Sequence, residues 1–199
     1  MRIGLSVRRA GREAAAIGAP ENHEGKASRF KALALPHLDD VYTLARYLVP
    51  RADADDVVQE CYLRAWRYFD SFSGLAIKPW LFAILRNVCL SKRAQNAGFA
   101  PAERIATDDA AQEIPPLWGG SPESPESALI RRETAMTLYR LIQELPGEFR
   151  EVLVLRELNG LTYREIAQVT GAPAGTVMSR LSRARQMLRE AFTAMEGGT

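Results

Sequence analysis

Apolar residues recur at helical spacing along most of the chain, and prolines, glycines and polar clusters separate the helical stretches. In the first half the spacing predicts helices over residues 27–49, 53–69 and 80–93. Pro36 divides the first of these and Pro50 ends it. Residues 70–79, with a Ser-Gly pair at their centre, are predicted to form a loop.

The second half also shows apolar residues at helical spacing. Residues 129–145 and 148–158 carry apolar positions at helical spacing, and Pro146-Gly147 lies between them. Asn159-Gly160 then predicts a turn into the last part of the chain. Together with two further helices after this turn, the second half is predicted to form a four-helix domain.

Residues 161–188 are predicted to form a helix-turn-helix. Thr162 and Glu165 have the spacing of a capping box, Gly171 ends the first helix, and Pro173 begins the second. One face of the second helix is apolar, through Val177, Leu181, Ala184 and Leu188. Its other faces carry arginines and hydroxyls but no acid. An amphipathic hairpin with a solvated basic face would share some of these features, but their combination favours DNA binding.

Residues 96–128 differ in composition from both halves. They are rich in proline and glycine, and acidic side chains outnumber the single base, Arg104. Such a segment is typical of a flexible linker between domains. The fold class is therefore all-α, with two small helical domains at 27–95 and 129–193. A disordered basic tail is expected at 1–26 and a short tail at 194–199.

Composition narrows the possible functions. The 199 residues have a net charge of only +2, so affinity for nucleic acid must come from local basic patches. No apolar run approaches the roughly 20 residues that span a bilayer. Catalytic motifs such as a P-loop or His-Glu-x-x-His are missing, so we expect no enzyme.

Metal and cofactor sites are not expected. The cysteines Cys61 and Cys89 and the histidines His23 and His37 lack the spacing of metal ligands. So few cysteines suit a reducing cytoplasm.

Two of the first-half helices carry candidate chemistry. The helix at 53–69 has a polar face opposite a wide apolar stripe, and Glu60 and Arg64 form an i,i+4 pair on it. The helix at 80–93 combines aromatic with basic residues, a combination that suits single-stranded nucleic acid. Phe82 is expected in the core, whereas for Trp80 a core role and a base-stacking role are equally supported.

Three segments carry a family resemblance: DADDVVQECYLRAWRYFDSF at 53–72, PWLFAILRN at 79–87, and LPGEFREVLVLRELNGLTYREIAQVTGAPAGTVMSRLSRAR at 145–185. In this order, separated by an acidic linker, they resemble the extracytoplasmic-function (ECF) sigma factors, the smallest members of the sigma-70 family. The resemblance covers roughly residues 30–193. It implies a subunit that gives bacterial RNA polymerase its promoter specificity, acting in a stress or environmental response.

The resemblance also implies roles for the first domain. The face formed by Asp56, Gln59 and Glu60 would dock on the clamp of the largest catalytic subunit of core RNA polymerase. The loop at 70–79 and the helix from Trp80 would capture the −10 element as a melted strand. Asn87 matches the family's base-reading position, and backbone binding or duplex opening would fall to Trp80, Arg86, Lys92 and Arg93.

The second helix of the helix-turn-helix would read the −35 element in the major groove. Four side chains point away from the apolar stripe and are the candidates for base edges: Met178, Ser179, Ser182 and Arg183. Thr176, Arg180 and Arg185 flank them and would grip phosphates. Met178 departs from the basic or polar residue of many relatives. The acidic linker resembles the segment that threads through polymerase.

The family also suggests how the protein is controlled. An anti-sigma factor that buries the DNA- and polymerase-binding faces is the expected regulatory partner, and the free protein is expected to be a cytoplasmic monomer without membrane contact. The alternative is a stand-alone helix-turn-helix repressor or activator, which normally dimerises on two half-sites. That alternative explains residues 129–193 but leaves the helices at 53–69 and 80–93 without a role.

Overall fold

A computed structural model describes residues 21–74, 76–96 and 125–196, and within these ranges the chain is helical and contains no strand. The all-α prediction is thereby confirmed. The first half contains α1 (Glu21–Ala34), η1 (Leu35–His37), α2 (Leu38–Leu48), α3 (Arg51–Tyr68), η2 (Phe69–Ser71) and α4 (Ile77–Asn96). The second half contains α5 (Pro125–Glu144), α6 (Gly147–Leu153), η3 (Val154–Leu158), α7 (Tyr163–Thr170) and α8 (Ala174–Glu196).

The apolar stripes predicted from the sequence form the core of the first half. The side chains of Val58, Cys61 and Ala65 on α3 are buried, and so is Phe69 at the start of η2; α3 packs against α4. Phe82 is fully buried, which confirms its assignment to the core. Pro36 lies in η1 and separates α1 from α2, because its ring cannot continue a helix without losing a backbone hydrogen bond.

The N-terminal boundary of the first domain was wrong. We expected a disordered tail over 1–26, but α1 begins at Glu21. The Lys26 ammonium lies 2.5 Å from Asp70 Oδ2 and 4.9 Å from the centre of the Trp66 ring, so tertiary contacts hold the first turns of this helix. Local composition could not show those contacts. The earlier part of the predicted tail lies outside the described residues.

Two other boundaries also differ. α5 begins at Pro125, inside the segment assigned to the linker, because proline is well suited to the first turn of a helix. α4 begins at Ile77, inside the predicted loop, and Pro79 likewise occupies its first turn. The rest of the predicted linker, 97–124, lies outside the described residues.

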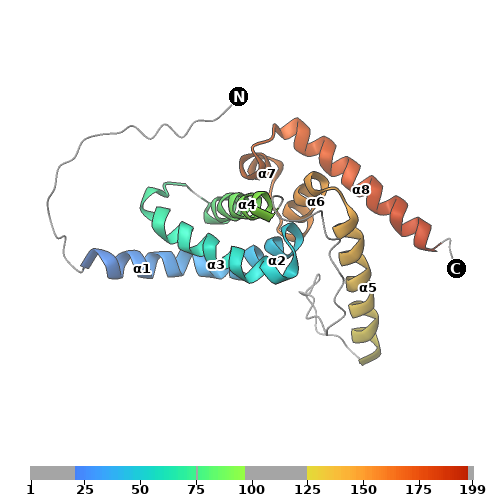
Figure 1. Ribbon diagram of the computed structural model, residues 1–199, viewed down its shortest axis with the longest axis horizontal. Coiled ribbons are helices and arrows are strands. Elements are labelled where there is room, and N and C mark those ends of the chain that lie inside the picture. Colours follow the sequence, from blue (N-terminus) through green and yellow to red (C-terminus); the bar gives the residue numbers. More distant parts are fainter. Residues whose placement is uncertain (1–20, 75, 97–124, 197–199) are drawn as a thin grey trace.

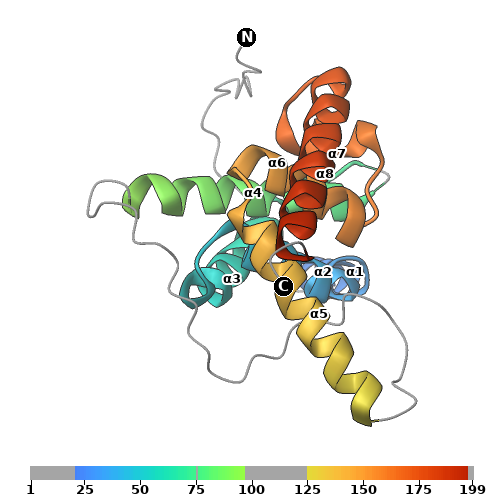
Figure 2. The ribbon, with the colours of Figure 1, turned by 90° about the vertical axis from the view of Figure 1, so that its right-hand side faces the viewer.

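The two halves pack against each other. In Figures 1 and 2, α4 lies between the layer formed by α1, α2 and α3 and the helices α6, α7 and α8. α4 packs on α7, and α2 packs on α6. Buried side chains from both halves form one continuous hydrophobic cluster, which includes Leu85 and Val88 of α4 and Val152 and Ile166 of the second half. α5 extends away from this body (Figure 2).

Candidate nucleic-acid interface

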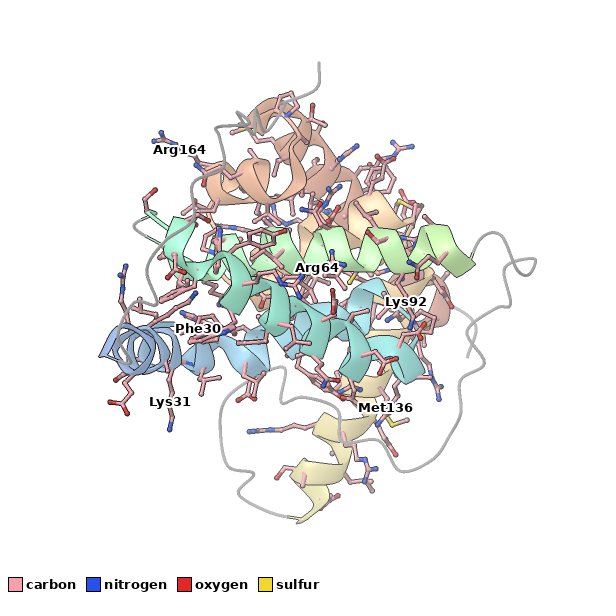
Figure 3. The ribbon with its side chains drawn as sticks, turned by 60° about the vertical axis from the view of Figure 1, so that its left-hand side comes forward. Phe30, Lys31, Arg64, Lys92, Met136 and Arg164 are labelled. Atoms are coloured by element: carbon pink, nitrogen blue, oxygen red, sulfur yellow. The ribbon has the colours of Figure 1, made fainter. Side chains whose placement is uncertain are left out.

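The polar face of α3 points into solvent. Asp56 and Gln59 are exposed, and Glu60 is half-buried. Glu60 Oε1 accepts a hydrogen bond of 2.6 Å from Arg64 Nε, the i,i+4 pair expected from the sequence. Arg64 lies on the outer side of α3 in Figure 3. The face is therefore a polar surface open to a partner, and its role in docking on polymerase stays a prediction.

Lys92 connects this face to α4. Its Nζ lies 3.4 Å from Asp53 Oδ1 and 3.4 Å from Asp56 Oδ2, both on the first turns of α3 (Figure 3). The hydrogen bond to Asp53, together with the negative charges, raises the pKa of Lys92. Lys92, which is expected to contact DNA, thus lies against Asp56, which is expected to contact polymerase. The two predicted surfaces therefore adjoin.

Trp80 belongs to a row of aromatic rings. Its ring centre lies 5.0 Å from that of Phe72, which is stacked on Phe69 at 6.2 Å with an angle of 11° between the planes. Trp80 is half-buried, so part of its ring packs on the core and part faces solvent. The resemblance assigned the loop at 70–79 to the −10 strand but did not single out Phe72 within it. Its signal was a single large aromatic side chain in a loop of small and polar residues.

The other −10 candidates on α4 have different surroundings. Asn87 is exposed, with its side chain on the surface of the helix. Arg86 is half-buried, and its Nε donates a hydrogen bond of 2.6 Å to Glu151 Oε1 on α6. Glu151 was also missed. It is buried among apolar residues of α6, and a lone acid in an apolar stretch is the signal that could have indicated a buried cationic partner.

A groove at the junction of the two halves brings together candidates from both predicted DNA-binding helices. It has a volume of about 360 Å³, and Arg86, Arg93 and Arg180 contribute its cationic side chains. Glu148 and Glu151 line it as well, and its remaining lining residues are Leu48, Cys89, Leu90 and Gly147. Each acid pairs with one of the arginines: Glu151 with Arg86, as described above, and Glu148 Oε2 with Arg180 Nη2 at 2.6 Å.

The helix-turn-helix has the predicted local geometry. The backbone N–H of Thr162 donates to Glu165 Oε2 at 2.8 Å, and the backbone N–H of Glu165 donates to Thr162 Oγ1 at 3.3 Å. The Thr162 hydroxyl also donates to Glu165 Oε2 at 2.7 Å, and the two hydrogen bonds that the carboxylate accepts, from the backbone N–H and the hydroxyl of Thr162, lower the pKa of Glu165. Gly171 has φ +70°, the left-handed conformation that ends a helix most easily without a side chain. Gly160 in the preceding turn has the same φ.

One stripe of α8 fixes the orientation of the whole helix. Val177, Leu181 and Ala184 are buried, and Leu188 is half-buried. The four side chains expected to read bases all point to solvent on the opposite side: Met178, Ser179, Ser182 and Arg183. Met178 is 53% exposed, so its side chain is open to a partner on this face.

The flanking residues of α8 are held more firmly. Thr176 and Arg180 are half-buried, while Arg185 is exposed. Arg185 Nη2 lies 2.6 Å from Glu157 Oε1, and this hydrogen bond raises the pKa of the guanidinium. Arg180 and Arg185 are thus each anchored to an acid of the second half. A cationic side chain held in one position is better suited to contact a backbone phosphate than to read a base edge.

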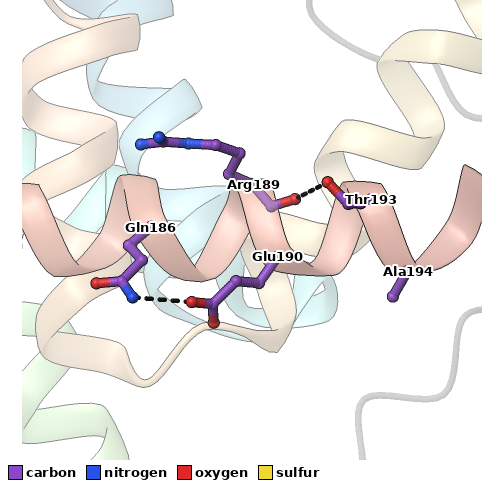
Figure 4. A pocket seen from close by; sticks show the side chains of 5 residues that line it. All are labelled: Gln186, Arg189, Glu190, Thr193 and Ala194. Atoms are coloured by element: carbon purple, nitrogen blue, oxygen red, sulfur yellow. Dashed lines mark hydrogen bonds between the residues drawn. The ribbon is translucent and has the colours of Figure 1, made fainter.

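The far end of α8 has a shallow depression, seen from close by in Figure 4. Its lining comes from this one helix, and two hydrogen bonds join lining residues to each other. Gln186 Nε2 donates to Glu190 Oε1 at 2.8 Å, and Thr193 Oγ1 donates to the Arg189 carbonyl at 2.9 Å. The polar groups that line the depression therefore do not converge on a common binding position.

The described ranges also contain two cysteine thiols. Cys61 and Cys89 are buried free thiols, and burial raises the pKa of each to about 12, which leaves little reactive thiolate. No cluster of side chains that could hold a metal ion occurs among the residues described. None of the described helices has the length and apolar character needed to cross a membrane.

Comparison with known proteins agrees with this geometry. Residues 33–98 match the family "Sigma-70 region 2", and residues 135–188 match "Sigma-70, region 4". The ECF RNA polymerase sigma-E factor of Escherichia coli K12 is 33% identical over 174 residues, which cover 83% of this chain and 87% of that protein. The RNA polymerase sigma-H factor of Pseudomonas aeruginosa PAO1 is 36% identical over 155 residues, 75% of this chain and 78% of that one.

Solved structures show the same fold. The sigma factor RpoE of Bartonella quintana, solved with the anti-sigma factor NepR, has a TM-score of 0.63 and 26% identity, covering 83% of this chain and 98% of that one. CnrH, solved with the cytosolic domain of CnrY, has a TM-score of 0.61 and 24% identity, covering 87% and 94% of the two chains. The chain belongs to the sigma-70 family, as one of its extracytoplasmic-function sigma factors.

Proposed function

We propose that this sigma factor binds core RNA polymerase and directs it to promoters that carry matching −35 and −10 elements. The observation that carries the proposal is the pair of surfaces on one chain. The exposed face of α8 would read a duplex, and the aromatic and basic surface of α4 would take a single strand. A protein that both reads and melts a promoter needs both surfaces, whereas a repressor needs only the first.

The polymerase contact is assigned to α3. Asp56 and Gln59 are exposed, and the helix is braced from behind by its buried stripe. Acidic groups on a rigid helix would steer the factor towards a basic surface of the clamp and fix its register there. A factor with these targets acts in the cytoplasm, as a specificity subunit and without catalytic groups of its own.

On α4, Asn87 is the proposed base reader, because an exposed amide can both donate to and accept from a base edge. Trp80 would stack on a flipped base through the exposed part of its ring, and the cations Arg86, Lys92 and Arg93 would bind the backbone. On α8, Arg183 can contact a guanine with two parallel hydrogen bonds.

We also propose control by an anti-sigma factor in a stress response. The Bartonella relative was solved bound to such a protein, and its chain is matched over nearly its full length. A partner that covered α4 and α8 together would block both DNA surfaces at once. Affinity purification of the tagged protein from its host, with and without stress, would test this. Recovery of polymerase alone under both conditions would contradict it.

The function itself is tested by run-off transcription with core RNA polymerase. The expected result is promoter-dependent transcripts that require both this protein and core enzyme. Tight binding of the purified protein to palindromic duplex DNA, with no effect on transcription by core enzyme, would instead identify a stand-alone helix-turn-helix regulator.

A further inference from the structure

The C-terminal end of α2 is capped by the other half of the chain. The last carbonyls of a helix lack partners within it. Here the Arg46 carbonyl accepts hydrogen bonds from Gln143 Nε2 at 3.0 Å and from the Tyr139 hydroxyl at 3.3 Å, both on α5. The Tyr47 carbonyl accepts one from Arg150 Nη1 on α6 at 3.2 Å. The first half thus uses donors of the second half to complete one of its helices.

The donors of this cap hold one another in place. Gln143 Nε2 also lies 3.0 Å from the Tyr139 hydroxyl, and Gln143 Oε1 accepts a hydrogen bond of 2.8 Å from Arg150 Nη1. The rings of Tyr47 and Tyr139 are in contact across the junction, with centres 5.1 Å apart and an angle of 53° between their planes. Burial lowers the pKa of Arg150, and the nearby positive charge of Arg93 lowers it further.

A second polar link crosses the junction from α4 to α6. The pair Arg86–Glu151 is short, at 2.6 Å, and only 25% and 11% of the two side chains are exposed. A hydrogen bond between two charged groups away from water is among the stronger polar contacts in proteins. This pair engages Arg86, which we assign to binding the −10 strand, and α7 packs against the helix that carries Arg86, α4.

This arrangement does not fit a promoter. Elements centred near −35 and −10 are about 25 base pairs apart, or about 80 Å along straight B-form DNA at about 3.4 Å per base pair. In the structure the helix-turn-helix touches α4 directly, through α7. The chain could nevertheless separate its halves, because residues 97–124, fully extended at about 3.3 Å each, would span about 90 Å.

We propose that the free chain holds itself in a closed, self-inhibited state, with two locks: the α2 cap formed by Tyr139, Gln143 and Arg150, and the Arg86–Glu151 pair. The inhibitory role of this closed state rests on the proposed function. In this state the −35 surface on α8 stays exposed, whereas Arg86 is engaged and α4 is covered on one side. The closed chain can meet a −35 duplex but cannot at the same time reach a −10 strand.

Other partners can replace the contacts of both locks when the halves separate. When the halves separate, water can solvate the two carbonyls at the end of α2. A phosphate can replace the Glu151 carboxylate on Arg86, so one charge-assisted hydrogen bond takes the place of another. Opening on polymerase and promoter would therefore cost less than breaking the same contacts without a replacement.

The test measures the distance between the halves in the free protein. Spin labels are placed on the full chain at exposed positions of the two halves, through Arg67→Cys on α3 and Thr193→Cys on α8. The native thiols are buried and remain unlabelled. Electron–electron resonance then gives the distance distribution without polymerase or DNA, so its result is independent of whether the protein directs transcription.

Glu151→Lys places like charges at the second lock, and it should shift the ratio of open to closed molecules at least tenfold. The charge swap Arg86→Glu/Glu151→Lys should restore the short distance. Glu157→Lys is the matched control, because it reverses a carboxylate that pairs with Arg185 inside the second half, and it should leave the distance unchanged.

If Glu151→Lys does not fold, as judged by circular dichroism, the pair Tyr139→Phe/Gln143→Ala removes donors of the first lock instead and should also lengthen the distance. A long, broad distribution for the wild-type chain would overturn the proposal. So would a short distance that neither lock variant changes. Failure in transcription with a closed, switchable wild-type chain would overturn the proposed function and leave the closed state intact.

Discussion

Arg183→Ala should relax promoter discrimination at one base pair of the −35 element. The buried stripe of Val177, Leu181 and Ala184 fixes the rotation of α8, and Arg183 lies on the exposed opposite side. A guanidinium held there can make two hydrogen bonds to a guanine in the major groove. Losing them should reduce the preference for that base pair by about 1–3 kcal/mol, or about 5- to 150-fold.

Arg180→Ala is the matched control for this prediction. Arg180 lies on the same helix, but its guanidinium is anchored 2.6 Å from Glu148 and the side chain is half-buried. We expect this variant to weaken all promoters by a similar factor, as the loss of a phosphate contact does.

The assay is transcription by the reconstituted holoenzyme from a set of promoters that differ by one base pair at each −35 position. Arg183→Ala should flatten the response at one position and leave the profile elsewhere unchanged. Equal loss on every promoter would refute the base-reading role of Arg183, and it would place this residue among the phosphate contacts.

Four further variants test other parts of the account. Glu60→Lys should weaken capture of core polymerase several-fold while leaving the thermal unfolding temperature of the protein within about 2 °C of wild type, because the Glu60–Arg64 pair lies at the surface and stays partly in contact with solvent. An unfolded first half would show that this face is structural. Thr162→Ala removes a helix cap and should cost about 1 kcal/mol in chemical denaturation, and no change would refute the capping box. The hydrogen bonds from Thr162 lower the pKa of Glu165, so they stabilise the folded state at pH values above the ordinary glutamate pKa of about 4.3. This stabilisation is lost as the pH falls through the lowered pKa of Glu165. Glu165→Gln should therefore make the free energy of unfolding less dependent on pH in the acid range. Phe82→Ala should destabilise the first half by about 3–5 kcal/mol, because the ring is fully buried, and a loss under about 1 kcal/mol would contradict its place in the core.

Features with a local cause could be predicted from the sequence. The buried stripe on α3 followed from helical spacing, because residues three and four apart share a face. The capping box and the turn at Gly171 followed from side chains that satisfy or permit a specific backbone geometry within a few residues.

Features that depend on distant residues could not be predicted. α1 begins at Glu21 because Lys26 finds partners on α3 and η2, more than 30 residues away in the chain. The pairing of Arg86 with Glu151 joins residues 65 positions apart, so no periodicity within either helix indicates it. Helical spacing identifies which faces are apolar, but it does not determine which of those faces meet.

The most direct test of the central claim is to map transcription start sites in the native host with this protein overproduced. We predict that new start sites arise, that the DNA upstream of them shares a −35 and a −10 element, and that Asn87→Ala abolishes them while the folded protein still accumulates. The account would be contradicted if overproduction created no new start sites, or if the only effect were altered use of existing starts that share a single palindromic site.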